Sequence, residues 1–152
     1  MQKHDFYQSL VKQTESLIAG ESNVIANMAN ISALLFTSLE DVNWAGFYFI
    51  DSPSELVLGP FQGNPACIRI PVGKGVCGTA AATLQTQLIE DVHAFDGHIA
   101  CDAASNSEIV VPIMKHGKIF AVLDIDSPSI SRFDTDDKAG LEALVKCFEA
   151  SL

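Results

Sequence analysis

The stretch SEIVVPIMKHGKIFAVLDID, residues 107–126, decides the fold class. Its apolar parts, 107–114 and 118–126, are typical of β-strands, and the polar KHG between them indicates a turn. A turn this short joins two strands that run antiparallel. The second part is apolar on both faces until its last residues, which predicts a strand at the centre of a sheet.

Hairpin-linked strands and terminal helices are expected on both sides of this stretch. Further strands are predicted at 43–51, 55–63, 66–71 and 86–91, and a short helix at 76–85. Apolar steps of three and four residues predict helices over 3–19 and 22–39, and a last helix capped by Thr135. This order predicts one α+β domain over residues 1–152, with terminal helices on one face of a mostly antiparallel sheet of about six strands.

Composition favours a compact globular protein and disfavours several partners. Hydrophobic residues make up 48%, and 19 acids against 9 bases give a formal net charge of -10. That charge repels nucleic-acid phosphates and anionic membrane surfaces. No apolar run approaches the ~18 residues of a membrane span, and the first residues lack the apolar stretch of a secretory signal. We therefore expect a cytoplasmic protein, whose thiols are normally kept reduced.

Two carboxylates end the predicted central strand. Because side chains alternate along a strand, Asp124 and Asp126 are expected on the face of Phe120 and Val122. Carboxylates at the end of a buried strand are costly unless they meet water, a cation or each other's proton. Solvation where the strand leaves the sheet is an equally simple interpretation of the spacing.

The length of the turn decides whether a third carboxylate joins them. A three-residue loop, 115–117, would place Glu108 opposite Asp124, whereas a two-residue turn would pair Asp124 with Ile109 and point Glu108 away. We expect the three-residue loop. The resulting cluster would attract an ammonium group, keep one carboxyl protonated, or hold calcium or magnesium.

Two further motifs allow more than one interpretation. Trp44 and Tyr48 share a strand face with Gly46 between them, which suits core packing or a wall beside a bound ammonium. The run GKGVCG, 73–78, matches a dinucleotide-binding pattern, but the strand before it and the helix after it are short. We interpret its glycines as turn geometry that brings Cys77 to a helix start, where thiolate is favoured.

The other cysteines match no standard zinc pattern. Cys67, Cys77 and Cys101 are 10 and 24 residues apart. A zinc site that uses His98, Cys101 and either Cys67 or Cys77 is disfavoured but stays open. Cys101 lies in the polar run HIACDAASNSE, 98–108, inside a predicted loop at 92–106, whereas Cys147 lies among apolar residues of the last helix.

Several motifs together resemble the free methionine-R-sulfoxide reductases, which are stand-alone members of the GAF-domain fold. They are WAGFYF (44–49), GPFQGNPACIRIP (59–71), GKGVCG (73–78), IACDAASNSEIVVPI (99–113) and VLDIDS (122–127). The resemblance implies reduction of free L-methionine-(R)-S-oxide by a thioredoxin-dependent oxidoreductase that needs no metal or organic cofactor. A homodimer is compatible with that family.

The resemblance also implies residue roles. Cys101 matches the attacking cysteine, Cys67 the resolving cysteine that forms a disulfide with it, and Cys77 an auxiliary cysteine. The matching substrate-pocket residues are Trp44, Tyr48, Glu108, Asp124 and Asp126. The alternatives are a small-molecule-sensing GAF module without catalysis and a structural domain whose cysteines are incidental.

Overall fold

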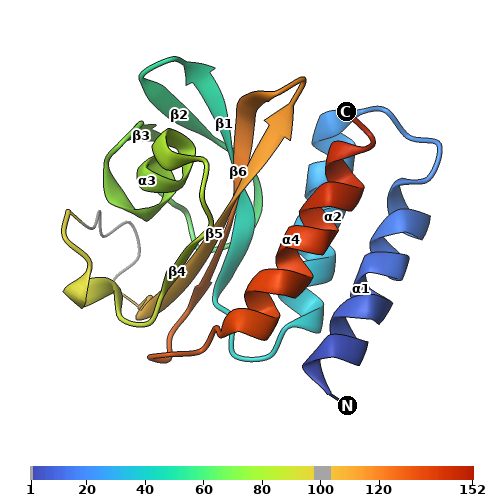
Figure 1. The fold of residues 1–152 in the computed structure, drawn as a ribbon, viewed down its shortest axis with the longest axis horizontal. Helices are drawn as coiled ribbons and strands as arrows, with labels where there is room; N and C mark the ends of the chain where they lie inside the picture. Colours follow the sequence, from blue (N-terminus) through green and yellow to red (C-terminus); the bar gives the residue numbers. More distant parts are fainter. Residues whose placement is uncertain (1, 98–103) are drawn as a thin grey trace.

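The computed structural model describes residues 2–97 and 104–152 (Figure 1). The helices are α1 (Lys3–Ile18), α2 (Val24–Ser38), α3 (Gly75–Thr83) and α4 (Thr135–Glu149), with a 3-10 turn η1 (Val92–Ala94). The strands are β1 (Trp44–Ser52), β2 (Glu55–Gly63), β3 (Arg69–Pro71), β4 (Gln87–Ile89), β5 (Ser107–Lys115) and β6 (Lys118–Ser127). Cys101 and His98 lie outside the described residues.

The strands form one sheet in the order β3-β2-β1-β6-β5-β4, and neighbouring strands pair antiparallel. Helices α2 and α4 pack on one face of this sheet, α1 packs against these two helices on the same side, and α3 lies on the other face (Figure 1). The α+β class, the six antiparallel strands and the terminal helices on one face are therefore confirmed. Strand β6, the predicted central strand, has β1 and β5 as its neighbours.

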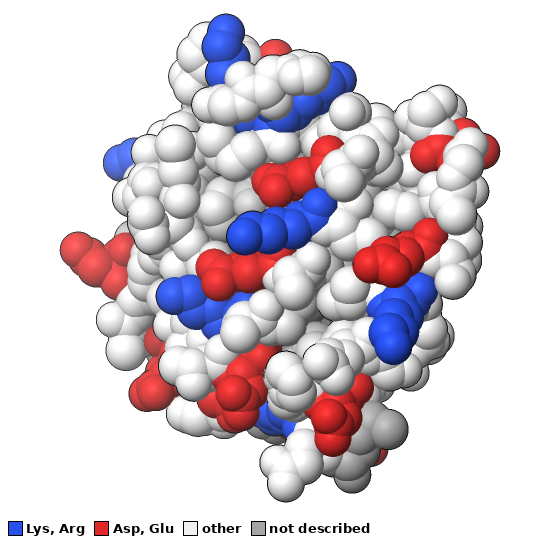
Figure 2. Space-filling view, turned by 45° about the vertical axis from the view of Figure 1, so that its right-hand side comes forward, with Lys and Arg blue, Asp and Glu red and all other residues white. Residues whose placement is uncertain are grey.

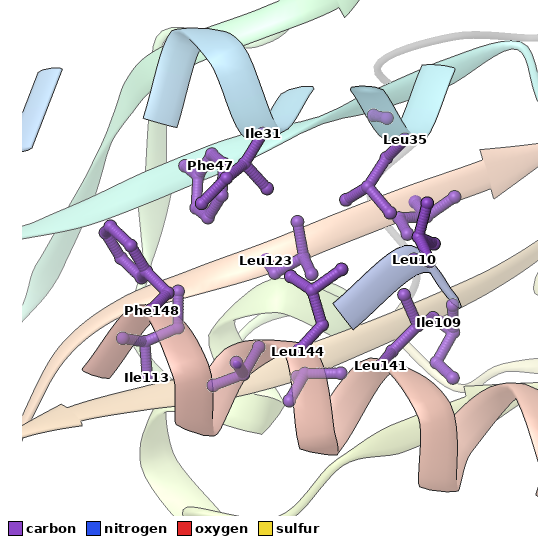
Figure 3. Close-up of a cluster of buried hydrophobic side chains, with 14 of the residues drawn as sticks. Leu10, Ile31, Leu35, Phe47, Ile109, Ile113, Leu123, Leu141, Leu144 and Phe148 are labelled. Atoms are coloured by element: carbon purple, nitrogen blue, oxygen red, sulfur yellow. The ribbon is translucent and has the colours of Figure 1, made fainter. Parts of the chain in front are cut away.

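Alternation along β6 divides the interior into two cores. Leu123 and Ile125 join the large core under α1, α2 and α4, part of which is shown in Figure 3. Val122 joins a smaller core under α3. Because Asp124 and Asp126 follow Val122 at two-residue steps, they also face α3. The helix layer is thus the apolar support of the fold, and the acids lie on the opposite side of the sheet.

The β5–β6 turn has two residues, so the predicted three-residue loop is wrong. Lys115 pairs with Lys118, and both central residues have positive φ, 52° at His116 and 77° at Gly117. These are the dihedral signs of a type I′ turn, whose twist matches that of the flanking strands. With regular pairing this turn would place Glu108 on the face opposite Asp124.

A β-bulge in the β5–β6 pair returns Glu108 to the face of Asp124. Ile113 pairs with Ala121 and the next residue of β5 pairs with Ile119, so Phe120 is an extra residue on β6. The shift puts Glu108 opposite Asp126, and all three acids share one face after all. It also moves Phe120 to the helix side, where its ring packs edge-on against Phe49. The expected common face of Phe120 and Val122 is therefore wrong.

The N-cap of α4 is Asp134 and not the predicted Thr135. The Asp134 carboxylate accepts hydrogen bonds from the backbone N–H groups of Asp136 and Asp137, and the Asp137 carboxylate accepts one from the Asp134 N–H. This reciprocal capping box satisfies backbone donors that a helix start leaves free. Asp137 also accepts hydrogen bonds from the Tyr7 hydroxyl at 2.7 Å and from Lys3 Nζ at 2.6 Å, which ties α1 to α4.

Gly140 lets α1 and α4 approach closely. A Cβ atom there would lie 2.1 Å from Tyr7 Cγ. We expect Gly140→Ala to lower the free energy of unfolding by about 1–3 kcal/mol, because overpacking outweighs the gain in helix propensity. Chemical denaturation measures this change. In a Tyr7→Ala background the substitution should cost nothing, and an equal cost in both backgrounds would contradict the steric explanation.

On the helix-covered side of the molecule, basic and acidic side chains are interspersed over the surface and do not separate into large patches of one sign (Figure 2). Within residues 2–97 and 104–152, no helix has the length and apolar character needed to span a membrane.

Candidate functional site

Three buried carboxyls lie together on the α3 face of the sheet. Glu108 on β5 is 7% exposed, and Asp124 and Asp126 on β6 are 5% and 9% exposed. Burial raises the pKa of Glu108 well above its ordinary value, and the charges of the two aspartates raise it further. Burial also raises the pKa of Asp124, although hydrogen bonds from its neighbours oppose this effect. The cluster therefore favours keeping a proton, above all on Glu108.

Asp124 has one carboxylate oxygen without a donor. Its Oδ1 atom is buried and has no hydrogen-bond partner among the described residues. Leaving a buried acceptor unpaired costs about 1–3 kcal/mol, and more when the group is charged. Such an atom leaves a buried acceptor that a donor or cation beyond the described residues can pair with.

Cys77 on α3 belongs to the same cluster. Its Sγ atom and carboxylate oxygens of Glu108 and Asp124 all lie within 4.8 Å of one another. Burial first, and then the charges of Asp124 and Glu108, raise the pKa of this thiol well above its ordinary value. The expectation that the helix start favours a thiolate is therefore wrong for this environment, because desolvation and two nearby acids outweigh the helix dipole.

The glycines on both sides of Cys77 shape a turn, as expected. Gly73 and Gly75 have φ values of 89° and 64°, and a Cβ atom at Gly78 would lie 2.3 Å from the Pro71 carbonyl oxygen. Strand β3 has three residues, α3 has nine, and β3 pairs antiparallel with β2. This stretch therefore lacks the parallel strand–helix–strand unit of a dinucleotide site.

Aromatic residues of strand β1 form a wall beside the acids. Trp44 pairs with Asp126 across β1 and β6, and Gly46 pairs with Asp124. The rings of Trp44 and Tyr48 are stacked with centroids 6.0 Å apart. Both aromatic residues are almost fully buried in the smaller core under α3, next to the acids.

Phe61 is a third member of this wall, and no local sequence pattern indicated it. Its ring stacks on Trp44 at 5.1 Å, and its Cβ would lie 2.2 Å from a Cβ added to Gly46. The space left by Gly46 is thus taken by Phe61 of the neighbouring strand. The motif GPFQG, 59–63, contained this residue, but only the β1–β2 register places it beside Trp44.

The indole N–H of Trp44 and the hydroxyl of Tyr48 donate hydrogen bonds to the segment that carries Cys67. Trp44 Nε1 donates a hydrogen bond to the Asn64 carbonyl at 3.1 Å, and the Tyr48 hydroxyl donates one to the Cys67 carbonyl at 2.9 Å. Cys67 is half-buried and disulfide-bonded, whereas Cys77 and Cys147 are free thiols. The structure therefore brings Cys67, Cys77, the aromatic residues and the three acids into one region, while Cys101 lies outside the described residues.

Comparisons with known proteins show the family to which the chain is similar. A family model described as GAF domain matches residues 26–146. A free methionine-R-sulfoxide reductase of Escherichia coli is 57% identical over 152 residues, which cover 100% of this chain and 92% of the relative. A protein of the same description from Saccharomyces cerevisiae is 44% identical over 99% of this chain and 88% of its own.

Solved structures give the same result. The Staphylococcus aureus protein fRMsr, in complex with substrate, is 57% identical with a TM-score of 0.91, covering 96% of this chain and 95% of that one. A free methionine-R-sulfoxide reductase of Neisseria meningitidis, also with its substrate, is 44% identical with a TM-score of 0.95, covering 99% and 90%. A GAF domain of a Coxiella burnetii phosphotransferase, 15% identical with a TM-score of 0.88, shares the fold alone.

Proposed function

This chain belongs to the free methionine-R-sulfoxide reductases of the GAF-domain family, and from that premise we propose that its acidic cluster binds free L-methionine-(R)-S-oxide for reduction to methionine. It is an oxidoreductase, like the relatives that match it over nearly its whole length. We infer the preference for the R epimer from the names of those relatives. The roles of individual residues are inferred from the chemistry of the site.

One observation carries the assignment of the binding site, namely the buried Asp124 Oδ1 atom without a donor. A free amino acid has an ammonium group that supplies both hydrogen-bond donors and a positive charge. Glu108 and Asp126 add negative character around the same place. The stacked Trp44 and Tyr48 rings next to them offer an apolar surface for the methyl-sulfoxide side chain and a favourable face for a cation.

We infer that the chemistry uses Cys101 as nucleophile. Its thiolate attacks the sulfoxide sulfur and forms a sulfur–sulfur bond, while a protonated carboxyl gives its proton to the sulfoxide oxygen. Transfer of this oxygen to the Cys101 sulfur breaks the sulfur–sulfur bond, which releases methionine and leaves Cys101 as a sulfenic acid. The raised pKa of Glu108 supports that residue as the proton donor. In this step the sulfoxide gains two electrons and Cys101 loses them.

The sulfenic acid then condenses with the Cys67 thiol, which releases water and forms a disulfide. The disulfide-bonded state of Cys67 supports this role. The hydrogen bond from the Tyr48 hydroxyl to the Cys67 carbonyl would hold the resolving cysteine beside the aromatic wall. A thioredoxin-like dithiol, available in a reducing cytoplasm, would reopen the disulfide by exchange. Cys77 would then be auxiliary, because burial keeps its thiol protonated.

An assay with the purified chain tests the proposal. With dithiothreitol as reductant, the R epimer of free methionine sulfoxide should be converted to methionine, measured by chromatography, and the S epimer should remain. Binding without methionine formation would contradict the proposal and favour a sensing module.

A further inference from the structure

We propose that Cys77, Glu108 and Asp124 form a binding site for a zinc ion, which inhibits the enzyme by occupying the place of the substrate ammonium. The ligand atoms of these three residues lie within 4.8 Å of one another and come from α3, β5 and β6. Zinc–ligand distances of about 2.0–2.3 Å put ligand atoms at mutual distances that this arrangement reaches with small side-chain adjustments.

A second observation points to a ligand at the same place. Asp124 is 5% exposed, and its Oδ1 atom has no hydrogen-bond partner among the described residues. A cation bound to this oxygen would remove the cost of an unpaired buried acceptor. Asp126, paired with Glu108 across the two strands, adds a further acid next to the three ligands.

The donor set selects the metal. Calcium and magnesium prefer oxygen ligands alone, whereas thiolate together with carboxylate suits zinc. One thiolate and two carboxylates carry three negative charges, which a divalent ion reduces to one. On binding, the thiol proton of Cys77 leaves to the buffer and a sulfur–zinc bond replaces the sulfur–hydrogen bond.

Zinc binding does not depend on the proposed function, but competition with substrate rests on it. The same Asp124 oxygen would contact the ammonium group or the metal. Two positive groups cannot share it. Zinc and free methionine sulfoxide should therefore exclude each other.

Calorimetric titration with zinc chloride tests the site in protein kept without added thiol. We expect one zinc ion per chain, at least about tenfold weaker binding in Cys77→Ser, and unchanged binding in the matched control Cys147→Ser, which replaces a second cysteine that is a free thiol in the described part of the chain. Cobalt(II) should give a thiolate-to-metal absorption band with the wild type and the control, but not with Cys77→Ser. Equal zinc affinity in Cys77→Ser, or a cobalt band that survives in it, would overturn the site.

A second variant covers the case in which Cys77→Ser does not fold. Asp124→Asn keeps the size of the side chain and should weaken zinc by at least about tenfold, because it removes a charged ligand. Undiminished binding in a folded Asp124→Asn protein would overturn the proposal.

Kinetics separates this inference from the proposed function. Raising free methionine sulfoxide should relieve inhibition by zinc, and inhibition that substrate does not relieve would overturn the competition. An active enzyme that does not bind zinc would contradict the proposed metal site and support the proposed function. A chain that binds zinc but never forms methionine would contradict the proposed function and support the metal site.

Discussion

Cys101→Ser is expected to lower methionine formation by at least about a thousandfold, to the background of the assay. A serine hydroxyl does not form a sulfenic acid, so neither the first electron transfer nor the later disulfide is available. Initial rates with the R epimer of free methionine sulfoxide, with dithiothreitol in excess, measure this loss.

Two other cysteine variants make the test specific. Cys147→Ser should keep the wild-type rate, because Cys147 is a free thiol on α4, across the sheet from the acids. With a thioredoxin-like protein as reductant, Cys67→Ser should form about one methionine per chain and then stop, because the sulfenic acid lacks its resolving partner. Full activity of Cys101→Ser would show that the nucleophile is assigned wrongly.

N-acetylation of the substrate is expected to reduce kcat/KM by a factor between about a hundred and a few thousand. The acetyl group replaces the ammonium by a neutral amide, and the buried acids then lose the charge that pairs with them. Removing one partner of a buried ion pair costs about 3–5 kcal/mol, which gives that range at 1.4 kcal/mol per tenfold. Comparing kcat/KM for free and N-acetylated methionine sulfoxide measures the effect.

A variant of the chain links this discrimination to Asp124. Asp124→Asn should lower kcat/KM for the free amino acid and bring it closer to the value for the acetylated one, because the acid that pairs with the ammonium is gone. Equal rates for both substrates in the wild type would disprove the charge argument. An unchanged preference in a folded Asp124→Asn enzyme would show that another group recognises the ammonium.

Local sequence patterns predicted most of the secondary structure. The two strands of the hairpin 107–126 and the glycine turn at 73–78 agree with the structure, because each depends on residues close together in the chain. The N-cap of α4 was predicted one residue late, since Thr135 and Asp134 are both good caps and only the side-chain geometry distinguishes them.

Local sequence patterns did not predict the strand register that forms the acidic site. Three carboxylates on one face were predicted, but from a loop that the structure does not have. Instead, a two-residue turn and a bulge at Phe120 together return Glu108 to the side of Asp124 and Asp126. A bulge depends on packing against neighbouring strands, so the hydrophobic pattern did not reveal it.

What the sequence determined by itself is the set of elements and the chemical groups they carry: antiparallel hairpins, terminal helices, acids after a buried strand and the cysteine motifs of a reductase family. The tertiary structure alone decided that Phe61 fills the space beside Gly46 and that Cys77 lies within 4.8 Å of two carboxylates, with a protonated thiol as the consequence. The physical reason is that periodicity and turn signals act over a few residues, whereas burial and charge proximity arise when α3, β1, β2, β5 and β6 meet.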